Sequence, residues 1–134
     1  MSQAAIRKEL ETKLVAWAAN YSTPIQLALE NSPFIKPADY SPFIEAYLVP
    51  SLVKSTTVDG VNRRYIGIFH LNVWTKDGQG AGLSERILQE IENLFPVVPK
   101  TGNVSIEKTP NASRGVVSEG WRVTPITINY RYEQ

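Results

Sequence analysis

His70 is the only histidine in the chain, and histidine is the side chain best suited to act as a general base near neutral pH. Its strand neighbours, Ile68 and Asn72, are neither nucleophiles nor carboxylates. The segment 115–120 contains Ser118 but lacks the spacing of a nucleophile elbow. With a single histidine and no cysteine, the chain also lacks the usual ligands of zinc sites. We therefore expect no enzyme activity, no cofactor and no metal, and we interpret His70 as a polar position on an exposed or subunit-covered strand.

A glycine loop, residues 76–82, joins an alternating strand to an amphipathic helix and raises the question of a phosphate site. A dinucleotide fingerprint beginning at Gly78 would need glycine where Leu83 stands, and the Walker lysine followed by serine or threonine is absent. The preceding strand alternates, whereas the parallel strands of nucleotide-binding folds are usually apolar on both faces. The loop is interpreted as a plain strand-to-helix connection.

Positive charge and aromatic rings occur together at Arg63, Arg64, Tyr65 and Trp74, as they do in nucleic-acid platforms. The string does not match the RNA-recognition pattern, and a formal net charge of +1 gives no general attraction to nucleic acid. A small nucleic-acid-binding accessory protein remains an alternative, favoured if Arg63 and Arg64 cluster with Arg122 and Arg131.

The elements that position these residues follow from hydrophobic spacing. Apolar residues at helical spacing predict a first helix near residues 2–19 and a second after the glycine loop, ending before Pro96. Alternating segments predict strands near 25–30, 42–49, 63–75, 104–108 and 121–132. Pro50 is expected to end the second strand, Pro125 to place the last strand at an edge or a bulge, and residues 110–120 to form a polar loop.

The order α-β-β-β-α-β-β predicts an α+β two-layer sandwich, with a mostly antiparallel sheet of about five strands and both helices on one face. A length of 134 residues suits one domain spanning 1–134, and the polar stretch 51–62 is expected to be a flexible hairpin tip. No stretch approaches the roughly 20 apolar residues that cross a bilayer, so no membrane contact is expected. Charged residues stand where a signal peptide would be apolar, so we expect a cytoplasmic protein.

The third strand predicts two faces, one for the core and one for a partner. Tyr65, Gly67, Phe69, Leu71 and Val73 are assigned to the core. An uncovered sheet face with apolar and aromatic residues favours association. The expected oligomer or partner interface comprises Arg63, Arg64, Ile66, Ile68, Trp74, Tyr130 and Tyr132.

The chain resembles the tail terminator, or tail completion, proteins of long-tailed bacteriophages. The motifs that carry this resemblance are the first helix ending near Trp17, the turn 30–34, the proline-led strand 42–49, the strand 65–74 with its glycine loop, the helix end 94–96 and the closing strand 120–131.

The resemblance implies a structural protein of the virion tail, assembled in the bacterial host cytoplasm. Family members form a hexameric ring that caps the tail tube, ends its polymerisation and presents a surface to the filled head. The implied partners are other copies of the chain, the tail tube protein and a head-connector protein, with DNA only passing through the ring. A head-to-tail connector or neck component is the alternative within the same class.

Overall fold

In the computed structural model, which describes residues 2–21, 25–30, 33–55, 63–78, 82–97, 104–112 and 115–133, seven strands form a single mixed sheet. The elements are α1 (Ser2–Asn20), β1 (Gln26–Leu29), β2 (Phe43–Ser55), β3 (Arg63–Lys76), α2 (Gly82–Leu94), β4 (Val104–Ile106), β5 (Asn111–Ala112), β6 (Val116–Ser118) and β7 (Trp121–Glu133). The predicted α+β class and both helices are confirmed. The expected five strands are too few, because two short strands lie in the predicted polar loop.

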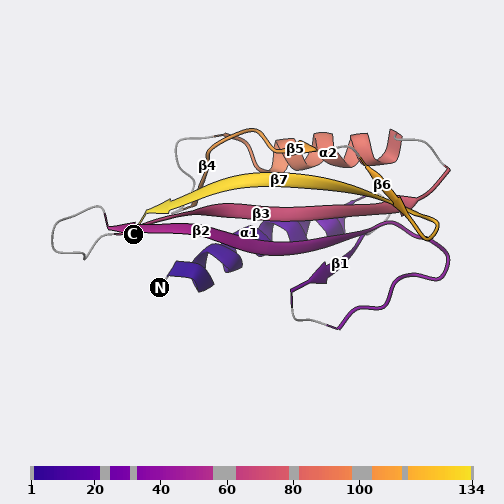
Figure 1. Ribbon diagram of the computed structural model, residues 1–134, viewed down its shortest axis with the longest axis horizontal. Helices are drawn as coiled ribbons and strands as arrows, with labels where there is room; N and C mark the ends of the chain where they lie inside the picture. Colours follow the sequence, from indigo (N-terminus) through magenta and orange to yellow (C-terminus); the bar gives the residue numbers. More distant parts are fainter. Residues whose placement is uncertain are drawn as a thin grey trace.

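The sheet has the strand order β1-β2-β3-β7-β4, and β5 and β6 also pair with β7. Every pairing is antiparallel except that of β1 with β2, which is parallel. The long strands β2, β3 and β7 run side by side, with α1 behind them (Figure 1). The mostly antiparallel character was predictable, but the parallel first pair was not.

The main core lies between one face of the sheet and both helices. A single cluster of buried side chains joins Ile6, Leu10 and Leu14 of α1 to Ile87 and Ile91 of α2. The cluster also contains Tyr65, Phe69, Leu71 and Val73 of β3, as predicted. Burying each large apolar side chain contributes about 1.5–3 kcal/mol, so this layer supplies most of the folding energy. Among the described residues, neither helix is long and apolar enough to cross a membrane.

β2 continues past Pro50, contrary to the prediction that proline ends this strand. The register with β3 shifts between Pro50 and Leu52, which marks a β-bulge. A bulge interrupts the regular ladder and so accommodates a residue that has no N–H to donate. The strand then runs to Ser55, and the rest of the predicted hairpin tip, residues 56–62, lies outside the described residues.

The predicted polar loop before β7 is instead a tight hairpin. Ser118 pairs with Trp121, and the two residues between them, Glu119 and Gly120, have φ angles of 48° and 83°. Two successive positive φ angles define a type I′ turn, whose twist matches antiparallel strands. This hairpin places β6 on the outer side of β7.

Pro125 does not lie in an edge strand, which was one of the predicted options, because β7 pairs with β3 on one side and with β4, β5 and β6 on the other. On the outer side, β6 pairs as far as Val123 and β5 begins pairing at Ile126. The outer ladder is therefore interrupted at proline, which is where a strand tolerates this residue.

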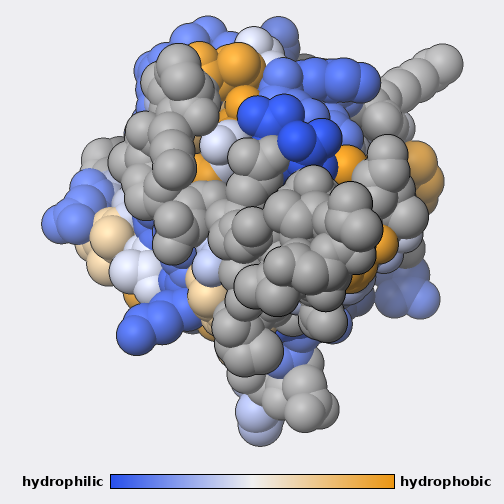
Figure 2. Space-filling model, turned by 90° about the vertical axis from the view of Figure 1, so that its left-hand side faces the viewer, coloured by the Kyte–Doolittle hydropathy of each residue, from blue (hydrophilic) through white to orange (hydrophobic). Residues whose placement is uncertain are grey.

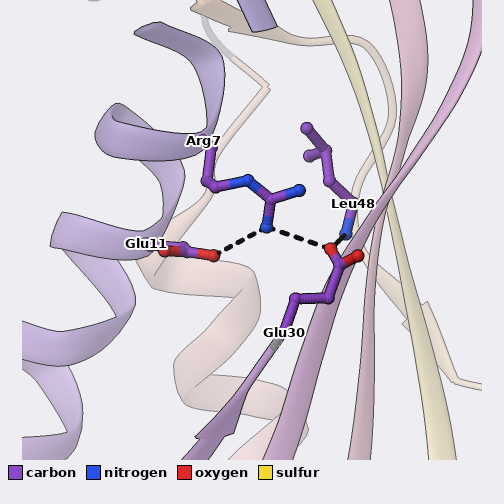
Figure 3. Close-up of polar contacts among 4 residues, drawn as sticks. All are labelled: Arg7, Glu11, Glu30 and Leu48. Atoms are coloured by element: carbon purple, nitrogen blue, oxygen red, sulfur yellow. Dashed lines mark hydrogen bonds and ion pairs between the residues drawn. The ribbon is translucent and has the colours of Figure 1, made fainter. Parts of the chain in front are cut away.

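A group of polar contacts ties α1 to the edge of the sheet (Figure 3). Nη1 of Arg7 lies 3.1 Å from a carboxylate oxygen of Glu11 and 2.9 Å from one of Glu30. The same oxygen of Glu30 accepts a hydrogen bond of 2.9 Å from the backbone N–H of Leu48. Since β1 pairs with β2 only as far as Ala46, the Glu30 carboxylate occupies the next donor along the edge of β2.

Candidate partner interface

The face of the sheet opposite the helices, here called the open face, carries side chains that are half-buried over most of its length. It is built from alternate residues of β2, β3 and β7, which the cross-strand pairing aligns. On β3 it comprises Arg64, Ile66, Ile68, His70, Asn72 and Trp74, all of intermediate exposure. In the described residues no helix packs on this face.

Four of the seven predicted interface residues lie on the open face: Arg64, Ile66, Ile68 and Trp74. Arg63 belongs to β3, but its side chain lies outside the described residues. The prediction was wrong for the remaining two residues. Tyr130 and Tyr132 are 0% and 8% exposed and belong to the main core under the helices.

The two tyrosines were misplaced because of how antiparallel strands pair. β3 and β7 are aligned so that Gly67 pairs with Tyr130 and Tyr65 pairs with Tyr132. Directly paired residues point to the same face, so the even-numbered residues of β7 share the core face with the odd-numbered residues of β3. The alternation within one strand predicts two faces, but not which face of the next strand adjoins each.

A line of hydrogen bonds crosses the middle of the open face. His70 Nε2 donates to Asn72 Oδ1 at 3.0 Å, and Asn72 Nδ2 donates to Glu45 Oε1 at 3.1 Å. The same oxygen of Glu45 accepts a bond of 3.1 Å from Trp74 Nε1. The His70 ring also lies 5.0 Å from that of Tyr47. These contacts fix side-chain positions and present no nucleophile, which agrees with the interpretation of His70 as a polar strand position.

Glu45 is the residue that the sequence interpretation missed. It is the only charged residue in the otherwise apolar or aromatic segment 42–49, and that isolation was the available signal. A carboxylate on a half-covered sheet face requires donors, and here Asn72 and Trp74 supply them.

One end of the open face is covered by an aromatic cluster. Phe43 stacks on Trp74 with ring centroids 5.2 Å apart and meets Trp121 edge-on at 5.1 Å. The connection 33–42 folds over these rings, since Phe34 lies 4.8 Å from Phe43 and Tyr40 lies 4.9 Å from Trp121. Lys36 Nζ lies 4.3 Å from the centroid of Trp74. Trp74 is thus engaged within its own chain, and the half-exposed apolar side chains of the other end are Ile66 and Ile68.

An unusual backbone conformation supports this cover. Tyr40 has a φ of 60°, which places its ring against Trp121. Asp39 holds the turn, because one of its oxygens accepts hydrogen bonds from the N–H and the hydroxyl of Ser41 at 3.1 and 2.7 Å. These bonds hold the pKa of the Asp39 carboxyl below its usual range.

At the end of the molecule that lies on the left in Figure 1, the described residues form no broad apolar area. In the view of this end, the coloured residues are mainly hydrophilic, with hydrophobic ones in small separate areas (Figure 2). Among the described residues no cluster of histidine, aspartate and glutamate could hold a metal ion.

The family model for the phage tail terminator protein matches residues 4–130, nearly the whole chain. The chain belongs to the phage tail terminator family. The protein therefore has a structural role in the phage tail, and it is located in the tail of the virion.

A solved structure whose name states no function supports the same fold. It is 27% identical in sequence to this protein, with a TM-score of 0.79, and the alignment covers 98% of this chain and 96% of that one. No match was found among curated proteins.

The nucleic-acid-binding alternative required Arg63 and Arg64 to cluster with Arg122 and Arg131. The structure does not bring Arg122 to the same face as Arg64 and Arg131. Arg131 pairs across from Ile66 on the open face, whereas Arg122 pairs with Thr75, which points to the other face. Arg64 lies on the same face as Arg131. Arg122 is therefore separated from Arg64 and Arg131 by the thickness of the sheet.

Proposed function

We propose that the terminator closes into a hexameric ring that sits on the end of the tail tube, stops addition of tube subunits and provides the surface to which the filled head attaches. The observation that carries this proposal is the match to the terminator family across residues 4–130. A contact between unlike surfaces forms a ring when the rotation closes, and a closed ring cannot extend as a filament. The ring assembles in the host cytoplasm, and DNA passes through it.

The open face provides contacts with the tail tube protein or the head-connector protein. Ile66 and Ile68 are half-exposed apolar side chains on a sheet face, and Arg64 lies beside them. Apolar side chains with a flanking arginine are typical of interface centres. The Trp74 end is filled by the protein's own aromatic rings, so the contact lies toward Arg64.

A capping assay tests this function. Purified tube protein is allowed to polymerise with and without the terminator, and tube lengths are measured by electron microscopy, with light scattering reporting ring mass. Rings at the tube ends and an arrest of growth are the expected result. Unchanged tube growth in the presence of folded terminator would refute the capping function, and binding to the head-connector alone would indicate a neck component instead.

A matched pair of variants tests the open face. Ile68→Glu places a charge on the face, and Val97→Glu places the same charge on an exposed valine after α2. We expect Ile68→Glu to lower capping at least tenfold with unchanged folding, and Val97→Glu to cap as the wild type does. Equal capping by both variants would show that the open face does not contact the tail tube.

A further inference from the structure

The two outer edges of the sheet are unlike surfaces. β1 forms one edge and, in the described part of the chain, pairs only with β2. At the opposite side, the short strands β4, β5 and β6 line the outer side of β7. Edge strands carry unpaired backbone N–H and C=O groups, which can pair with another chain.

We propose that neighbouring copies of the terminator join by these edges, with β1 of one copy pairing antiparallel with β6 of the next, so that the sheet continues from subunit to subunit. This inference rests on the proposed ring and specifies how its subunits are held together.

The strand directions allow this pairing. β1 is parallel to β2, and the successive pairs β2 with β3, β3 with β7 and β7 with β6 are all antiparallel. β1 therefore runs opposite to β6. When a second copy stands beside the first in the same orientation, its β6 meets β1 antiparallel. The two surfaces differ, so the contact is head-to-tail, which is the kind that can close into a ring.

The two edge strands meet at one row of the sheet. A single row of paired residues crosses the whole sheet from Gln26 through Phe43, Trp74 and Val123 to Val116. From this row β1 and β6 extend in opposite directions. A stagger of about two residues between copies, of the kind that closed sheets carry, aligns the two strands in full and keeps each side chain on its face.

The side chains of β6 suit an edge contact. Val116 and Val117 are 61% and 57% exposed, although large apolar residues are usually covered. Val116 is paired with Val123 and so points to the side of the open face, while Val117 points to the side of the helices.

Hollows on both sides of β1 can receive them. On the open-face side is a pocket of about 450 Å³, where Ala28, Phe34 and Phe43 form part of the lining and the charged Glu30, Lys36 and Glu45 another part. On the helix side is a hollow of about 440 Å³ lined in part by Val15, Ala16 and Leu29. Pairing of an added strand with alternate side chains in pockets on its two sides is a recurring mode of peptide recognition.

The test uses two variants that each damage one edge. Val116→Lys/Val117→Lys charges two exposed residues of β6, and Ala28→Lys places a charge in the pocket beside β1. Val97→Lys, at a valine that is 52% exposed after α2, is the control. Circular dichroism and urea unfolding verify that each variant is folded, and sedimentation velocity with electron microscopy measures assembly.

We expect the wild type and Val97→Lys to form rings and each edge variant alone to stay monomeric. A mixture of the two edge variants retains one intact pairing, between β1 of the β6 variant and β6 of the β1 variant, and should give dimers that grow no further. Rings from either edge variant, or a mixture without dimers, would overturn the edge pairing while leaving the ring intact. A wild type that forms no rings, even on tube ends, overturns the ring and the edge pairing together.

Discussion

Gly67 and Tyr130 are direct partners across β3 and β7, and the tyrosine occupies the space that a side chain at Gly67 would need. A Cβ atom at Gly67 would collide with the Tyr130 hydroxyl and would lie only 2.7 Å from a Tyr130 ring carbon and from the carbonyl oxygen of Val49. The carbonyl comes this close beside the bulge in β2, where Pro50 pairs with Gly67. An aromatic side chain covering a strand glycine in this way pins the register of both strands.

Gly67→Ala is therefore expected to destabilise the protein by about 1–3 kcal/mol, the usual cost of overpacking a core. Urea unfolding measures the change. Gly82→Ala is the control, because nothing lies within 4 Å of the added methyl group at that helix start. A Gly67→Ala variant as stable as this control would show that the sheet absorbs the methyl group freely.

The turn between β6 and β7 predicts a stabilising change. Glu119 has a φ of 48°, a conformation that asparagine adopts more readily than glutamate. Glu119→Asn should stabilise the protein by about 0.5 kcal/mol, within the range of backbone-compatible substitutions. Gly120→Ala should do the opposite, since Gly120 has a φ of 83° and an added Cβ would lie 3.0 Å from the Tyr40 hydroxyl. Thermal unfolding of both variants checks the opposite signs.

The carboxylate of Glu45 should stabilise the open face through its two donors. Glu45→Ala leaves Asn72 Nδ2 and Trp74 Nε1 without their acceptor, and partly buried donors left unpaired cost about 1–3 kcal/mol. Glu45→Gln keeps a carbonyl oxygen at this place and should cost less. Unfolding free energies from urea titration compare them, and equal losses in the two variants would contradict the hydrogen-bond role.

Glu30 predicts a dependence of stability on pH. The bond from the Leu48 N–H, assisted by Arg7, holds the pKa of the Glu30 carboxyl below its usual range. A carboxyl with a lowered folded pKa contributes stability that is full above the ordinary value, about 4.3, and is lost as pH falls through that value toward the folded pKa. The wild type should thus lose more stability than Glu30→Gln between pH 6 and pH 3.

The magnitude of this effect should be small. The side chains of Arg7 and Glu30 are 37% and 42% exposed, and ion pairs with such access to solvent contribute less than about 1 kcal/mol. Urea midpoints at both pH values measure it, with Glu107→Gln, at an exposed glutamate after β4, as the control. Parallel pH profiles for the wild type and Glu30→Gln would exclude a role for Glu30 in the pH dependence.

The spacing of apolar residues along the sequence decided which parts of the fold could be predicted. The core faces of both helices and of β3 follow from spacing alone, since Ile6, Leu10, Phe69 and Leu71 repeat with the period of their element. The parallel pairing of β1, the continuation of β2 past Pro50 and the short strands β5 and β6 depend on contacts between distant segments, which local pattern does not encode.

The residues of the open face were predicted only in part for the same reason. Alternation placed Ile66 and Ile68 together, but assigning Tyr130 required the register between β3 and β7. The engagement of Trp74 with Lys36 depends on a connection folding back over the sheet, for which the sequence carries no periodic signal. Glu45 could have been singled out as an isolated charge, although its partners could not.

Because the aromatic cluster covers only one end of the open face, the two ends of the sheet differ in how many of their faces are covered. Near Trp74 and Trp121 the strands are covered on both faces, by the helices on one side and by the connection 33–42 on the other. Toward Arg64, within the part of the chain that the structure describes, the same strands have a covering layer on the core face alone. Because local opening is rarer where more apolar contacts hold the backbone, we expect β3 to open locally more often near Arg64 than near Trp74. We therefore expect the sheet near Arg64 to adjust its twist when it contacts a partner, while the sheet near Trp74 keeps its shape.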